Sequence, residues 1–303
     1  MKRRIRAMAL LAALTLLCGC GKKEAQPQQE DMAVNIVPVE GVTALELCDG
    51  EVTLRFARTD DTWHWVDDGT FPLDQDAVAA LLALPSSLAA AEPVQGQGEL
   101  SGYGLETPKK YVTATADGAD STIYVGSQTS DGRWYVLTPD GVVRLAAEAD
   151  GAALSRSIYD MAVLPELPAI TEENLISLTL TGAEGKQVTF SVDESGVRRS
   201  GARDVTEKTA SLVDELGKLA VTACVDYDPA DGAAAVCGLD VPEAILAVNY
   251  VNAHGGDGAL TLTVGGSTGD GGRYVTLNGD ATIYRMEETG LAQVLTLAAL
   301  GLS

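Results

Sequence analysis

The chain has 303 residues, of which 43 are acidic and 21 are basic, so its formal net charge is −22. Nucleic-acid binding needs basic residues clustered along one face, and this acidic balance excludes it. With 46% hydrophobic residues, the chain is long enough to bury a core without a scaffold of disulfides.

The first residues have the layout of a secretory signal. The stretch MKRRIR is cationic, AMALLAALTLL is an apolar run shorter than the roughly 20 residues of a spanning helix, and LCGCG follows it. The order Leu17-Cys18-Gly19-Cys20 resembles a bacterial lipobox, because Gly19 places a small residue at the cut. The sequence therefore predicts a lipoprotein signal peptide over residues 1–19 and lipidation of Cys20. The alternative is an uncleaved membrane anchor.

Residues 20–35 are polar, contain proline and have no periodic apolar positions, which is typical of a flexible tether. Acyl chains on Cys20 would attach the folded region to a membrane without a spanning helix. We therefore expect a lipid-anchored protein on the extracytoplasmic face of the bacterial cell membrane. Removal of the signal peptide, which holds four basic residues and no acidic one, would leave a net charge near −26.

The region after the tether begins with a hairpin and a helix. Apolar and polar residues alternate in LELCDGEVTLRFA around Asp49-Gly50, which predicts two antiparallel strands. Asp74 and Asp76 then stand where they can cap a helix. The apolar face of that helix would consist of Val78, Leu81 and Leu82.

A Gly-Leu-x-x-Pro motif follows the helix. Gly104 is free to adopt a positive φ, Leu105 offers an apolar anchor, and Pro108 stops a helix and starts a strand. The stretches YVTATADGADSTIYVG and RWYVLTPDGVVRLA then indicate strands joined by Asp-Gly turns. A terminal helix over GAALSRSIYDM closes the unit.

The second half of the chain repeats these motifs. The stretch YVGSQTSDGRWYV matches TVGGSTGDGGRYV, so that Gly126 and Asp131 fall on Gly265 and Asp270, 139 residues later. Likewise GLETP recurs as GLDVP 134 residues later.

The elements between these motifs recur as well. SLTLTGAEGKQVTFSV has the pattern of the first hairpin, and Asp204 and Glu207 suit a capping box before a second helix. Its apolar face would consist of Leu212, Val213, Leu216 and Leu219. We therefore predict a tandem duplication, residues 36–165 and 166–303, of an α+β unit. Each unit would be a mainly antiparallel sheet with one or two packed helices.

These motifs resemble a known family. The helix followed by LSGYGLETP, then YVGSQTSDGRWYV and GVVRL, is similar to the bacterial domain-of-unknown-function 4340 family (DUF4340) over nearly all of the region after the tether. The second copy departs from this pattern, with Cys237 where Tyr103 stands and no tryptophan. The resemblance implies a secreted or lipoprotein β-rich module without an established catalytic residue. Some relatives resemble accessory components of gliding-type ABC transport systems, which implies a partner role.

Three cysteines belong to the folded region: Cys48, Cys224 and Cys237. They are too few for a disulfide framework. Cys224 and Cys237 either pair across VDYDPADGAAAV or stay buried as free thiols, and the sequence leaves both open.

Two stretches match the motifs of chemical sites. Asp226, Asp228 and Asp231 gather near a glycine as in a calcium loop, although their spacing is not that of an EF-hand, and a surface acidic loop is the alternative. GGSTG matches the nucleophile elbow, which needs a helix after the serine; a strand is predicted there, so we interpret it as a turn. The sequence predicts no cofactor.

The tryptophans, Trp63, Trp65 and Trp134, all lie in the first copy. Trp63 and Trp65 share one face of a predicted strand and, if exposed, would stack on a sugar ring or a peptide. The alternative is that these aromatic residues pack the core or the interface between the copies.

Two classes of function follow. The favoured one is a non-catalytic envelope module that binds a protein or glycan partner, because no nucleophile, base or metal-ligand cluster stands out. The other is an envelope-acting enzyme that uses dispersed carboxylates such as Asp131 and Asp270. A third hypothesis is an accessory subunit of an ABC-type export system.

Overall fold

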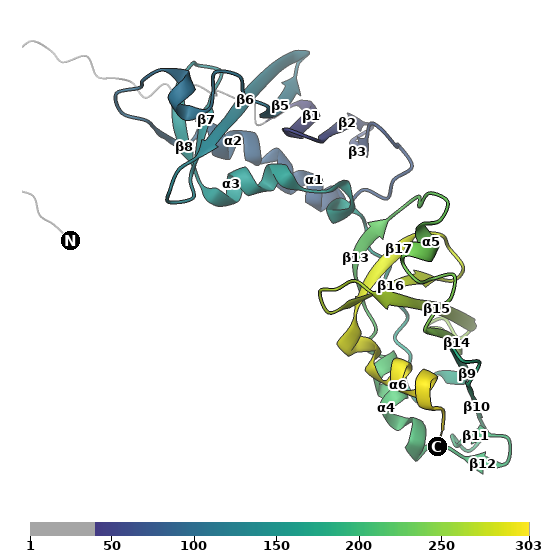
Figure 1. Cartoon of the computed structure of the whole chain (residues 1–303). Coiled ribbons are helices and arrows are strands. Elements are labelled where there is room, and N and C mark those ends of the chain that lie inside the picture. Colours follow the sequence, from purple (N-terminus) through teal and green to yellow (C-terminus); the bar gives the residue numbers. More distant parts are fainter. Residues whose placement is uncertain (1–39, 303) are drawn as a thin grey trace, which may run out of the picture. The chain divides into compact units, whose positions relative to one another are not determined.

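Residues 40–302 are described by the computed structural model, and they form two antiparallel sheets with short helices packed on them (Figure 1). The predicted α+β class is therefore confirmed. The predicted signal peptide at residues 1–19, the lipidation site Cys20 and the tether at residues 20–35 lie outside the described residues.

The first sheet has eight strands, and every neighbouring pair is antiparallel. These strands are β1 (Val42–Asp49), β2 (Thr53–Thr59), β3 (Thr62–Trp65), β4 (Glu92–Pro93), β5 (Lys110–Ala116), β6 (Ala119–Gln128), β7 (Trp134–Leu137) and β8 (Val143–Ala146). Their order across the sheet is β3-β2-β1-β5-β6-β7-β8-β4.

The second sheet has nine strands and is also antiparallel throughout. These strands are β9 (Leu175–Gly182), β10 (Gln187–Val192), β11 (Arg198–Ser200), β12 (Arg203–Asp204), β13 (Val221–Asp226), β14 (Ala244–Val251), β15 (Asp257–Ser267), β16 (Gly272–Leu277) and β17 (Ile283–Glu287). Their order is β12-β11-β10-β9-β14-β15-β16-β17-β13.

The two sheets follow the same path. The run β3-β2-β1 corresponds to β11-β10-β9, the run β5-β6-β7-β8 to β14-β15-β16-β17, and the closing edge strand β4 to β13, with β12 as an addition. The predicted pair of similar units is therefore confirmed. Their predicted limits, residues 36–165 and 166–303, stay a prediction.

Short helices complete each unit. The α-helices are α1 (Gln75–Leu82), α2 (Leu84–Ala89), α3 (Glu148–Ala152), α4 (Ala210–Leu216), α5 (Ala233–Val236) and α6 (Ala292–Leu300). The 3₁₀ turns are η1 (Leu100–Tyr103), η2 (Ala153–Ser155), η3 (Ile158–Met161), η4 (Glu207–Thr209) and η5 (Glu288–Leu291). The predicted terminal helix of the first unit is thus broken into short pieces, whereas that of the second forms the continuous α6.

Capping at the helix starts differs between the units. The carboxylate of Asp74 accepts hydrogen bonds from the N–H groups of the first turn of α1, at 2.9 Å from Asp76, as predicted. The predicted capping box of Asp204 and Glu207 is wrong. Asp204 Oδ1 accepts a hydrogen bond from the N–H of Thr206 at 2.9 Å instead, closing a turn, because a 3₁₀ turn precedes α4.

The strand alternation places one apolar face of each sheet in its own core. Phe56 on β2 and Phe190 on β10 occupy matching positions opposite Leu45 and Leu178, and all four side chains are fully buried. Burial of such a side chain contributes about 1.5–3 kcal/mol relative to exposure. The α1 side chains Val78 and Leu81, and the α4 side chains Leu212, Val213 and Leu216, are buried in these cores as predicted.

The two repeated motifs of each unit lie against each other. A Cβ on Gly126 would come within 2.2 Å of the Tyr103 carbonyl oxygen, and one on Gly265 within 2.4 Å of the Cys237 carbonyl oxygen. In both units the residue after the Tyr or Cys is a glycine at φ 68°. The two repeated motifs of the sequence therefore form a pair of packed loops, in which glycine is required because the two backbones approach closely.

Candidate functional site

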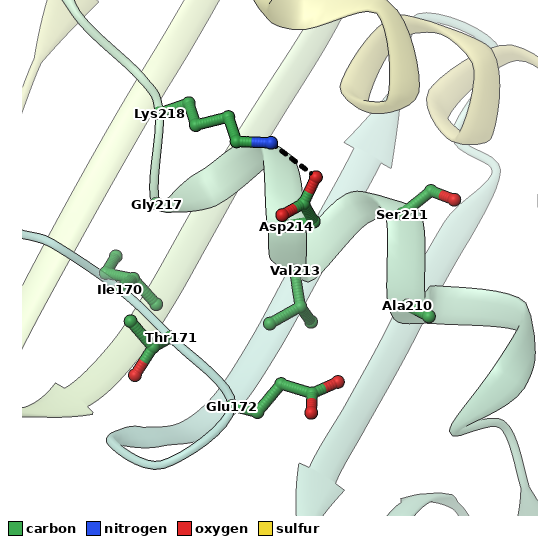
Figure 2. Close-up of a pocket in the computed structure, with 9 residues that line it drawn as sticks. All are labelled: Ile170, Thr171, Glu172, Ala210, Ser211, Val213, Asp214, Gly217 and Lys218. Atoms are coloured by element: carbon green, nitrogen blue, oxygen red, sulfur yellow. Dashed lines mark hydrogen bonds and ion pairs between the residues drawn. The ribbon is translucent and has the colours of Figure 1, made fainter.

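A pocket of about 590 Å³ opens beside α4 in the second unit (Figure 2). Its wall comes from two stretches, the segment before β9 and helix α4 with the two residues after it. The lining residues are Ile170, Thr171, Glu172, Ala210, Ser211, Val213, Asp214, Gly217 and Lys218.

The pocket has an apolar floor and a charged rim. Ile170 and Val213 form the floor, and their exposed fractions are 0% and 2% because they also belong to the core. Figure 2 shows the side chain of Val213 reaching from α4 toward Glu172 on the opposite segment. On the α4 side, Lys218 Nζ lies 2.6 Å from Asp214 Oδ2, and both side chains are exposed.

Glu172 is held by a buried cation. Nη1 of Arg198, at the start of β11, donates to Glu172 Oε1 at 3.0 Å, and Nη2 donates to the carbonyl oxygen of Thr206 at 2.5 Å. The Arg198 side chain is 4% exposed and that of Glu172 is 70% exposed. The ion pair therefore joins the interior to the rim of the pocket.

Arg198 takes the place that a tryptophan occupies in the first unit. Trp63 pairs with Arg58 on β2, and Arg198 pairs with Val192 at the matching position of β10. The backbone N–H of Trp63 donates a hydrogen bond to Oε1 of Gln75, at the start of α1, at 2.9 Å. In the same way, the backbone N–H of Arg198 donates a hydrogen bond to Oγ1 of Thr206 at 3.0 Å. Both side chains are buried. One copy thus carries an indole in its core where the other carries a guanidinium.

The tryptophans predicted as ligand contacts pack inward instead. Trp63 is 7% exposed within the first core, and Trp65 packs against the same core with its ring 5.5 Å from that of Phe71. Trp134 lies on Gly151, whose Cβ would come within 2.2 Å of the indole, and Lys110 Nζ lies 4.9 Å from its ring centre. An exposed stacking surface of these three is not formed, and core packing is the interpretation that the structure supports.

The repeated carboxylates, Asp131 and Asp270, stabilise the turns in which they lie. Asp131 accepts hydrogen bonds from the Thr129 hydroxyl and, at 2.9 Å, from Arg133 Nε, and these contacts lower its pKa to about 2. Asp270 accepts from the Thr268 hydroxyl, which with Arg285 lowers the pKa of that carboxyl as well. Both groups are solvent-exposed anions in a turn between two strands.

The cysteines of the folded region are free and buried. A disulfide between Cys224 and Cys237 is therefore not formed, and the free-thiol alternative holds. Cys224 packs with the first core, and burial raises the pKa of its thiol to about 11, with a further contribution from Asp226. Burial likewise raises the pKa of Cys237.

The acidic loop does not gather into a metal site. Asp226 Oδ1 accepts a hydrogen bond from the Tyr159 hydroxyl at 3.1 Å, whereas Asp228 and Asp231 are exposed. Across residues 40–302, no three His, Cys, Asp or Glu side chains are placed so that they could hold a metal ion. The calcium-loop hypothesis is thus replaced by its alternative, a surface acidic loop.

The GGSTG stretch is a turn, as interpreted from the sequence. Ser267 ends β15, its hydroxyl accepts a hydrogen bond from the N–H of Gly269 at 3.1 Å, and strand β16 follows. The strand-to-helix geometry of a nucleophile elbow is absent from this stretch.

The pocket residues were not singled out by the sequence. The correspondence of Arg198 with Trp63 comes from the strand pairing of the two sheets, and the repeated motifs of the sequence do not include these positions. The described part of the chain contains no helix with the length and hydrophobicity of a membrane span.

Comparison with known proteins identifies a family. No curated protein and no solved structure matches the chain. A family model described as "Domain of unknown function (DUF4340)" matches residues 63–232 and again residues 202–298. The two overlapping matches together cover more than half of the chain, and the protein therefore belongs to the DUF4340 family.

Proposed function

We propose that this protein is a non-catalytic, lipid-anchored module of the bacterial cell envelope that binds a partner protein through the pocket beside α4. The observation that carries the proposal is the pocket itself. Its volume of about 590 Å³ lies within the roughly 300–1,000 Å³ typical of ligand pockets. It combines a closed apolar floor with a rim of hydroxyl and charged groups.

The chemistry of the described residues favours binding over catalysis. The pocket lining contains neither histidine nor cysteine. Asp131 and Asp270, the carboxylates that the sequence offers to an enzyme, are fixed by the threonine and arginine side chains of their own turns. An anion with a lowered pKa is a weak general base at neutral pH.

A protein partner is favoured over a glycan. Sugar rings are commonly bound by stacking on exposed aromatic faces, and the three tryptophans are packed against the first core. The rim of the pocket instead offers charges and hydroxyls, from Glu172, Asp214, Lys218, Thr171 and Ser211.

A photo-crosslinking amino acid in place of Ser211, in the full chain expressed in its native host, tests this function. We expect a discrete crosslinked protein that is lost when Ala210→Trp fills the pocket. The matched control is the same substitution at Ser101, which is also exposed but lies in the first unit. The same products at both positions, or none at Ser211, would contradict the proposal. If the product is a transporter subunit, the function becomes that of an accessory component of an exporter.

A further inference from the structure

We propose that the pocket receives a basic side chain, lysine or arginine, from an exposed segment of the partner protein. In this proposal Glu172 is the counter-ion and Arg198 is a positioning residue that holds Glu172 in place. The inference rests on the proposed binding function and specifies the chemistry of the partner.

The charges around the pocket favour a cation. Glu172 and Asp214 contribute two carboxylates to the lining, and each already pairs with one cation, Glu172 with the buried Arg198 and Asp214 with the exposed Lys218. The preference for a cation therefore comes from the charge of the surrounding surface. Residues 166–303 contain 20 acidic and 8 basic residues, a net charge of −12. A surface of this sign attracts basic partners and repels acidic ones over distances of about a Debye length, roughly 8–10 Å.

Glu172 is prepared to accept a second cation. Its Oε1 is held by Arg198 Nη1 at 3.0 Å, and the carboxylate remains 70% exposed. A carboxylate offers about four acceptor positions on two oxygens, so this bond leaves capacity for a ligand. Because the side chain is already fixed, binding costs less conformational entropy than it would for a mobile glutamate.

The remaining rim suits a long basic side chain. Figure 2 shows Val213 between Glu172 and Asp214. Val213 is only 2% exposed, so the apolar surface that a ligand can reach in this lining includes the exposed Ala210. The methylene stem of lysine or arginine packs on such a surface while its charged end stays at the rim. The Lys218–Asp214 pair is about 70% exposed on both sides, so it is weak and an incoming cation can displace Lys218.

Comparison of the two units supports a role for Arg198 beyond folding. The first unit builds the same position with Trp63. A guanidinium in a core costs more than an indole unless every group is paired, and Nε of Arg198 has no hydrogen-bond partner among the described residues. The fold alone thus does not require an arginine at this position. An arginine is needed to hold the Glu172 carboxylate in place.

The test measures binding of a fluorescein-labelled peptide of alternating lysine and glycine to the full-length protein in neutral detergent. A peptide of alternating glutamate and glycine is the ligand control. We expect saturable binding of the lysine peptide only, with affinity reduced at least tenfold by Glu172→Gln. The matched variant is Glu173→Gln, which removes the same charge from the adjacent exposed residue outside the pocket, and it should change the affinity less than twofold.

The role of Arg198 is tested with Arg198→Met and Arg198→Lys. We expect Arg198→Met to lower the affinity for the lysine peptide at least threefold without lowering the unfolding midpoint. Arg198→Lys should retain part of the wild-type affinity. A midpoint that falls while the affinity is unchanged would show a purely structural arginine and overturn the positioning role.

The outcomes separate this inference from the proposed function. If Ser211 crosslinks a protein but the lysine peptide does not bind, or Glu172→Gln and Glu173→Gln act alike, the inference is wrong and the binding function stands. A crosslinked glycan at Ser211 would overturn the inference as well. If the peptide binds as expected but Ser211 crosslinks nothing in the envelope, the proposed function fails and only the preference for cations is left.

Discussion

Two glycines show how the repeated motifs work at the scale of single residues. Gly126 leaves room for the Tyr103 carbonyl and the Leu105 side chain, and Gly265 does the same for the Cys237 carbonyl and Leu239. Leu105 is 2% exposed, so the loop it anchors is part of the core. The motifs recur in both copies because each glycine is the contact point for the other motif of its unit.

We predict that Gly126→Ala destabilises the protein by about 1–3 kcal/mol, the usual cost of overpacking. Its Cβ would lie 2.2 Å from a backbone oxygen, which cannot move aside as a flexible side chain can. Urea unfolding followed by tryptophan fluorescence measures the loss. Gly102→Ala, where nothing lies within 4 Å of the added Cβ, should stay within about 0.5 kcal/mol of wild type. Equal effects at the two glycines would refute the packing explanation.

At the scale of secondary-structure elements, the second unit joins its two main helices through one carboxylate. Glu215 on α4 accepts hydrogen bonds from the N–H groups of Gln293 and Val294 in the first turn of α6, at 2.9–3.0 Å. The N-cap residue Leu291 has no side chain that can do this. Burial raises the pKa of Glu215, and the backbone N–H groups partly oppose that rise.

We predict that Glu215→Ala lowers the free energy of unfolding by about 0.5–2 kcal/mol, the range found for loss of a helix N-cap. The reason is that two N–H groups of α6 lose their acceptor. Thermal unfolding monitored by circular dichroism provides the measurement. The neighbouring Asp214→Ala removes only an exposed ion pair and should cost less than about 1 kcal/mol. If Asp214→Ala proved the more damaging of the two, the capping role of Glu215 would be untenable.

At the scale of the whole molecule, turn carboxylates in both units link stability to pH. The hydroxyl of Thr129 and then Arg133 lower the pKa of Asp131, and Thr268 and then Arg285 act in the same way on Asp270. The pKa of Asp193 is also depressed, first by the hydroxyl of a serine in its own turn. In the unfolded chain these carboxyls return to their ordinary value of 3.8.

We predict that the urea concentration at the unfolding midpoint decreases as the pH falls from about 4 toward 2. A depressed pKa means that the folded state binds fewer protons than the unfolded state in this window, so stability is present above it and declines below it. Urea midpoints at pH 7, 4, 3 and 2.5 test the prediction. The double variant Asp131→Asn, Asp270→Asn should show a shallower decline than wild type. A wild-type midpoint that is constant from pH 7 to 2.5 would rule out this linkage.

Much of the fold was predictable because its signals are local. The alternation around Asp49-Gly50 and the cap at Asp74 each depend on residues within a few positions, and both predictions were confirmed. The edge strands β4 and β13 were not predicted. They pair with β8 and β17, which are distant in the sequence, and β4 has two residues, too few for an alternating pattern.

The sequence by itself determined the α+β class, the duplicated order of elements and the family, since motif spacing and side-chain alternation are properties of the linear chain. Only the tertiary structure decided that the tryptophans face the core, that Cys224 and Cys237 stay free, and that Glu172 is fixed beside α4. The bond from Arg198 to Glu172 joins residues 26 positions apart. Such a contact depends on how β11 packs against the segment before β9, and no local pattern encodes that distance.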